Sequence, residues 1–204
     1  MTEILLTFLT GFIISFLGSI PPGTLNVTII QLGLEHRTEV AWRFALAAAL
    51  IEYPYAWLAV RFADMIANSP RITENLQLIS ALALLILGVI NLRAAGKVTR
   101  LYSKFHASGF RRGILLSILN PMALPFWIGV TAYVKSIGLI ELTTQPQVHG
   151  YLFGVSLGGL TLLIMLAYLA RRMVKHFEQN TLLKKIPGLT LMSLGLYGLY
   201  DYFL

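Results

Sequence analysis

One acidic residue stands out among those that could do chemistry. Glu52 lies in the apolar stretch Ala47–Tyr55, and no other Asp or Glu falls near the centre of an apolar segment. An acid at mid-depth in a bilayer costs at least about 2.5 kcal/mol, so such a residue usually faces a cavity and has a function. Glu52 could carry a proton or pair with the ammonium group of a substrate. The alternative is a protonated Glu52 that only makes a hydrogen bond between helices.

Aromatic residues and a proline follow Glu52 directly. Tyr53 and Tyr55 offer hydroxyl groups or an aromatic face for a cation. Pro54 lies between them and removes one backbone hydrogen bond from the expected helix. The surroundings of Glu52 therefore combine a charge, two hydroxyls and a loosened backbone.

Prolines also interrupt two other apolar segments, at Pro21-Pro22-Gly23 and at Asn120-Pro121. Proline has no backbone N–H group and clashes with the preceding turn, so a helix is expected to break at each place. A break frees carbonyl groups on one side and N–H groups on the other, and free N–H groups bind anions such as a carboxylate. The alternative is an ordinary proline kink that packing tolerates.

Polar side chains lie beside these breaks. Thr24 and Asn26 fall in the first turn after the first break, and Asn120 directly precedes the second proline site. Together with the surroundings of Glu52, they define a candidate site for substrate binding or coupling that comprises Glu52, Pro21, Pro22, Gly23, Thr24, Asn26, Asn120, Pro121, Tyr53 and Tyr55.

The elements that must position these residues are apolar segments long enough to cross a bilayer. The chain has 204 residues, of which 56% are hydrophobic and only 12% charged, whereas a soluble domain is about a quarter charged. Apolar runs of about 18 or more residues predict membrane-spanning helices, because lipid offers the backbone no hydrogen-bond partner. The six expected segments are Ile4–Leu34, Val40–Ile66, Leu76–Ala95, Gly113–Ile140, His149–Ala170 and Lys185–Phe203.

Basic residues are distributed unequally between the connectors. Of the 16 Lys and Arg residues, 13 fall after the first, third and fifth segments, and only Arg61, Arg71 and Lys135 fall on the other side. The positive-inside rule then predicts that both termini are extracytoplasmic and that the connectors at 96–112 and 171–184 are cytoplasmic. The net charge of +7 is therefore interpreted as a topology signal and not as a nucleic-acid-binding surface.

The two halves of the chain resemble each other. The stretch Gly11–Gly18 matches Gly113–Asn120 at Gly, Ser and Leu, with a constant offset of 102 residues. A repeat of three segments must be inverted in the membrane, because an odd number of crossings reverses it. Inverted repeats with interrupted helices are typical of secondary transporters. We therefore expect one all-α integral membrane domain, 1–204, built from two inverted three-helix repeats, about 1–102 and 103–204, with segments 1 and 4 broken at proline.

Several kinds of site are not expected. The sequence has no cysteine, and its four histidines have no metal-site spacing, so neither a metal nor a cofactor is predicted. It has no nucleotide-binding P-loop. Gly154, Gly158 and Gly159 form a face of small residues that favours close helix packing, either within the chain or in a homo-oligomer.

The order of the motifs resembles the lysine exporter (LysE/RhtB) family of amino-acid efflux transporters. The stretch Gly18–Gly23 is similar to that family's Pro-Gly break in the first segment, Leu119-Asn120-Pro121 to its Asn-Pro in the fourth, and Glu52 to its second-segment acid. The resemblance covers essentially the whole chain and implies a bacterial inner-membrane exporter driven by proton exchange. The chain has Met122 where the family commonly has a basic residue, and Pro-Pro-Gly where Pro-Gly-Pro is commoner, so neither lysine nor threonine is assumed.

The leading hypothesis is a secondary exporter of amino acids or similar small zwitterions, with the lipid bilayer and the substrate as its partners. A passive channel or a structural membrane subunit is the alternative, although no segment shows the polar stripe that lines a pore. An intramembrane enzyme is disfavoured, because the apolar segments lack cysteine and hold a single central acid.

Overall fold

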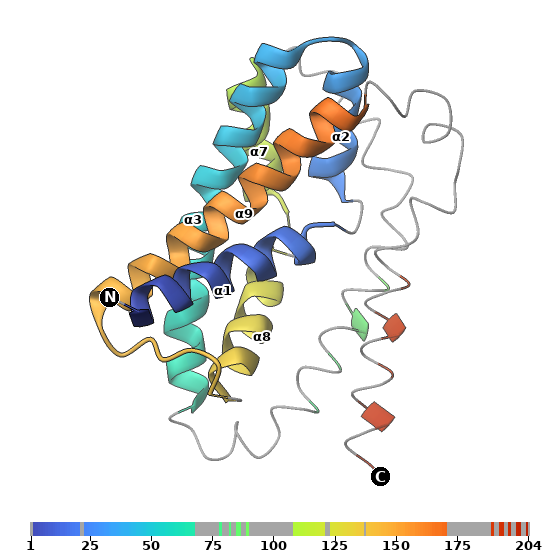
Figure 1. Ribbon diagram of the computed structural model, residues 1–204. Coiled ribbons are helices and arrows are strands. Elements are labelled where there is room, and N and C mark those ends of the chain that lie inside the picture. The colour runs from blue at the N-terminus through green and yellow to red at the C-terminus, as the bar shows by residue number, and fades with distance from the viewer. Residues whose placement is uncertain are drawn as a thin grey trace.

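The computed structural model describes residues 2–20, 23–67, 108–120, 123–136 and 138–170, with scattered positions between 78 and 89 and between 189 and 203. Within these residues the chain forms helices and no strand, so the prediction of an all-helical chain is confirmed for this part of it (Figure 1). The helices are α1 (Thr2–Gly18), α2 (Thr24–Leu34), α3 (Thr38–Ala67), α7 (Gly109–Ile118), α8 (Ala123–Ser136) and α9 (Gln145–Ala170). The expected segments Leu76–Ala95 and Lys185–Phe203 lie for the most part outside the described residues.

Two expected segments are each represented by a pair of helices. The first segment comprises α1 and α2, which are separated by residues 19–23. The fourth comprises α7 and α8, whose axes differ in direction by 64°. Pro21, Pro22 and Pro121 lie outside the described residues, so the assignment of these interruptions to proline stays a prediction. By contrast, α3 continues through Pro54, which is exposed on its surface.

The helices α1 and α9 lie side by side and run in the same direction (Figure 1). Small residues of α9 make this approach possible. A Cβ added to Gly154 would lie 2.9 Å from the backbone nitrogen of Phe12, and one added to Gly158 would lie 3.0 Å from that of Phe16. The glycine face anticipated from the sequence therefore serves helix packing within the chain.

A second parallel pair is formed by α3 and α7. A Cβ added to Gly109 would lie 2.7 Å from Cγ1 of Val40, and one added to Gly113 would lie 2.8 Å from Cβ of Ala47. The helix α9 in turn packs against α3 in the opposite direction, so that α3 and α9 join the two parallel pairs.

Apolar residues point outward as well as inward. Leu5, Leu9 and Ile13 of α1 and Leu50 of α3 are exposed, whereas Ser15 is fully buried. This distribution suits a surface that contacts lipid, where polar groups gain by turning inward. Among the described residues, α9 is the one helix long and apolar enough by itself to span a membrane, and α7 with α8 would pass as one bent span.

Candidate functional site

The Glu52 side chain lies where α1, α3 and α9 meet. Glu52 is half-buried on α3, and its Oε2 accepts a hydrogen bond from Oγ of Ser15 on α1, at 3.4 Å. On the opposite side, a Cβ added to Gly159 of α9 would lie 3.0 Å from Cδ of Glu52. The carboxyl group therefore occupies space that is open only because Gly159 has no side chain.

The polar groups at the first interruption are partly satisfied by side chains. Asn26 is buried on α2, and its Nδ2 donates a hydrogen bond of 2.6 Å to the carbonyl of Ser19. Gly23 is extended, with φ −98° and ψ −173°, and its carbonyl accepts a bond of 3.0 Å from N of Val27. Gly23, the N-cap residue of α2, has no side chain that could cap the helix. The first turn of α2, beginning at half-buried Thr24, therefore receives no side-chain cap from its N-cap residue.

The second interruption is also bound by a distant side chain. Tyr55 of α3 donates its hydroxyl hydrogen to the carbonyl of Ile118, the last residue of α7, at 2.9 Å. The half-buried Asn120 continues the chain by donating its N–H to the Ser117 carbonyl, at 3.2 Å. Its own carbonyl accepts from N of Ala123, at 3.3 Å. The helix that carries Glu52 thus also binds the end of α7.

The two interruptions approach each other. Gly18 is the last residue of α1, and a Cβ added there would lie 2.6 Å from Cζ of Phe126 in the first turn of α8. The Phe126 ring meets that of Trp127 edge to face, with centroids 5.1 Å apart, and Trp127 is only 2% exposed. Phe126 of the fourth segment therefore lies against the end of α1, which is the first helix of the interrupted first segment.

Tyr53 has a different neighbourhood from Tyr55. Its hydroxyl lies 2.5 Å from Nδ1 of His149, and its ring lies against those of His149 and Phe153 on α9. Of the two tyrosines, Tyr55 is therefore the one with a described contact at an interruption. His149, interpreted from the sequence as interfacial, is engaged in this contact between α3 and α9.

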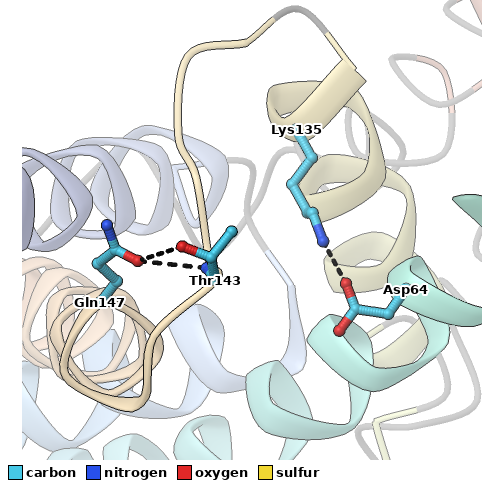
Figure 2. Close-up of polar contacts among 4 residues, drawn as sticks. All are labelled: Asp64, Lys135, Thr143 and Gln147. Atoms are coloured by element: carbon cyan, nitrogen blue, oxygen red, sulfur yellow. Dashed lines mark hydrogen bonds and ion pairs between the residues drawn. The ribbon is translucent and has the colours of Figure 1, made fainter.

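Further polar contacts join the helices far from Glu52. Figure 2 shows an ion pair between Asp64 of α3 and Lys135 of α8, and hydrogen bonds from Thr143 to Oε1 of Gln147, at 3.2 Å from N and 3.0 Å from Oγ1. Nε2 of Gln147 also donates to Glu3 of α1, at 2.8 Å. The ion pair connects α3 to α8, and the amide of Gln147 connects the start of α9 to α1.

Sequence reasoning missed three residues of this site, Ser15, Phe126 and Gly159. A signal for Ser15 was present, because it belongs to the motif that recurs 102 residues later at Ser117. Gly159 was assigned to general helix packing, and nothing in its local sequence pairs it with Glu52. The proline members of the predicted site, Pro21, Pro22 and Pro121, lie outside the described residues.

Comparison with known proteins gives two matches across nearly the whole chain. Residues 16–202 match the family model of the LysE type translocator. The chain is also 25% identical, over 203 residues, to a Bacillus subtilis (strain 168) protein described as "Putative amino acid efflux protein YcgF", a match that covers 95% of this chain and 93% of that protein. No solved structure matches the chain.

Proposed function

Because the chain belongs to the LysE type translocator family, whose model covers residues 16–202, it is a membrane transporter and not an enzyme, and we propose that it exports amino acids or similar small zwitterions. The substrate class follows the description of the Bacillus subtilis relative, which concerns amino acid efflux. We further propose that the export crosses the bacterial inner membrane, is driven by proton exchange, and leaves both termini extracytoplasmic.

The observation that carries the proposal is the position of Glu52. Its carboxyl group lies among α1, α3 and α9, bound by Ser15 and packed on Gly159. An ionisable side chain in the middle of a membrane-spanning segment is energetically costly, so a residue that is kept there usually has a function. Two uses fit an exporter. Glu52 could take up and release the coupling proton, or it could bind the ammonium group of the substrate.

The interruptions supply the complementary half of an amino-acid site. A substrate carboxylate needs hydrogen-bond donors, and the first turn of α2 presents N–H groups at an N-cap residue, Gly23, that has no capping side chain. Asn26 and Tyr55 already donate to the carbonyls of Ser19 and Ile118, which keeps those negative ends away from a bound carboxylate. We propose that the prolines of both interruptions maintain this open backbone.

The architecture proposed for transport is a pair of inverted repeats in one domain, about 1–102 and 103–204. Its support is the way the helices pair. In repeat order, α1 and α7 are first segments, and α3 and α9 are second segments. Each first segment packs in parallel on the second segment of the other repeat, α1 on α9 and α7 on α3. Such reciprocal pairing is what exchange of two related halves requires, and alternating access commonly works by that exchange.

The test is transport by purified protein in liposomes. The vesicles are loaded in turn with labelled amino acids, and release is followed with and without an imposed pH gradient. Proton-coupled export predicts that release of at least one amino acid is saturable. Release should also accelerate when the imposed pH gradient drives protons into the vesicles, opposite to the movement of the amino acid. Release that is unsaturable and indifferent to the gradient would favour the channel alternative.

A further inference from the structure

Two serines of the chain are equivalent in sequence but differ in their partners. Ser117 follows Ser15 by 102 residues, in the same recurring motif. The Ser15 hydroxyl donates to the Glu52 carboxyl group. Ser117 is only 3% exposed, and its buried Oγ has no hydrogen-bond partner among the residues that the structure describes. A buried hydroxyl without a partner is unfavourable, and a native structure rarely keeps one without a reason.

The helix contacts show which residues of the second segments correspond. Gly11 of α1 lies against Tyr151 of α9, and Gly113, its equivalent 102 residues later, lies against Phe44 of α3. Tyr151 therefore corresponds to Phe44, 107 residues earlier. The same spacing makes Gly159 the counterpart of Glu52.

Glu52 and Gly159 are thus equivalent positions that also contact each other. A pseudo-two-fold axis relates two inverted repeats, and two equivalent positions can touch each other only if both lie next to that axis. The axis therefore carries one carboxyl group, from Glu52, and an empty place at Gly159 that accommodates it. The Ser15 hydroxyl binds this carboxyl group, whereas Ser117, the equivalent residue of the other half by sequence, has no partner among the described residues.

We infer that Ser117 is the second partner of the Glu52 carboxyl group, binding it in the conformation that faces the opposite side of the membrane. This inference rests on the proposed function, since it requires that the two halves exchange conformations during transport. When the two halves exchange conformations, Ser117 takes on the surroundings that Ser15 has now, and Ser15 takes on those of Ser117. The carboxyl group at the axis then moves from one hydroxyl to the other, and each resting conformation leaves one hydroxyl without a partner. Ser117 is a positioning residue in this scheme.

A third serine provides a matched control. Ser156 of α9 is half-buried, and its buried Oγ likewise has no partner within the described part of the chain. Its counterpart by the same spacing is Ala49, which has no hydroxyl. Ser156→Ala therefore makes the same chemical change at a buried serine outside the proposed exchange.

The experiment measures from which side of the membrane one position can be labelled. The chain has no cysteine, and a Cβ at Gly23 has no neighbour within 4 Å, so Gly23→Cys provides a single reporter at the first interruption. An impermeant maleimide is applied to right-side-out and inside-out membrane vesicles, and the ratio of the two labelling rates reports the balance of the two conformations. No amino acid is needed.

Adding Ser15→Ala or Ser117→Ala to the reporter is expected to shift this ratio in opposite directions. Loss of one such hydrogen bond corresponds to a change of about three- to tenfold. Ser117→Thr, which keeps a hydroxyl, and Ser156→Ala are expected to leave the ratio near that of the reporter alone. Shifts in the same direction, no shift with Ser117→Ala, or an equal shift with Ser156→Ala would overturn the inference. If the opposite shifts occur but the chain with its native Gly23 transports no amino acid, the proposed function fails and the exchange of partners stands.

Discussion

Adding one methyl group at Gly159 is expected to disturb the carboxyl group of Glu52 while leaving the fold nearly intact. The new Cβ would lie 3.0 Å from Cδ of Glu52, the nearest atoms being the far end of a flexible side chain. Glu52 can move aside by rotation, but it then leaves the 3.4 Å hydrogen bond from Ser15. The free energy of unfolding should fall by only about 1 kcal/mol, or about 2–4 °C in Tm for a chain of this size.

Gly158→Ala is the matched comparison one residue earlier. There the added methyl group meets the Phe12 carbonyl and the Phe16 nitrogen, the latter at 3.0 Å, and backbone atoms cannot rotate away. The α1–α9 pair must separate, at a cost of about 1–3 kcal/mol.

Thermal unfolding in detergent and transport in liposomes are measured for both variants. The expected result is a larger loss of Tm for Gly158→Ala and, per folded molecule, a larger loss of pH-driven export for Gly159→Ala. Full export by Gly159→Ala, or equal losses of Tm with unchanged export in both variants, would refute the assignment of Gly159 to the site.

Two further predictions concern topology and the interruptions. In intact cells an impermeant thiol reagent should label Glu141→Cys and spare Ser103→Cys, because the basic residues predict a cytoplasmic 96–112 connector; the opposite labelling would reverse the topology. Asn26→Ala and Tyr55→Phe should each lower the free energy of unfolding by about 1 kcal/mol, because each leaves a helix-terminal carbonyl without its donor. Chemical denaturation in mixed micelles measures the loss, and unchanged midpoints for both variants would contradict this role.

Local sequence signals predicted most of the described helices. Apolar length gave α3 and α9 within about four residues of their observed bounds, because a bilayer-spanning helix needs a minimum apolar length. The expected fourth segment began at Gly113 and ended at Ile140, whereas α7 begins at Gly109 and α8 ends at Ser136. The predicted segment began too late because Arg111 and Arg112 interrupt the apolar pattern. The first turns of a helix tolerate such charged residues, so α7 includes them.

Contacts between distant segments could not be predicted in the same way. The Asp64–Lys135 ion pair and the Tyr55–Ile118 hydrogen bond join residues more than 60 positions apart, and no local pattern encodes such a meeting. The prediction of Glu52 as the central acid rested on its depth in an apolar segment and on its resemblance to the second-segment acid of the family. The contact of its carboxyl group with Gly159 depends on how α3 crosses α9. No local sequence pattern encodes that crossing, and the equivalence of the two positions emerges only from the helix contacts.

Glu52→Gln, measured in liposomes, is the most direct test of whether Glu52 carries the coupling or substrate charge. Glu39→Gln is the matched control, because the Glu39 side chain is 79% exposed and pairs only with Arg43 among the described contacts. Glu52→Gln is expected to abolish net export driven by a pH gradient, whereas Glu39→Gln is expected to retain it. Surviving counterflow of labelled amino acid would identify Glu52 as the proton carrier, and its loss would identify the partner of the substrate ammonium. Undiminished pH-driven export by Glu52→Gln would contradict the account.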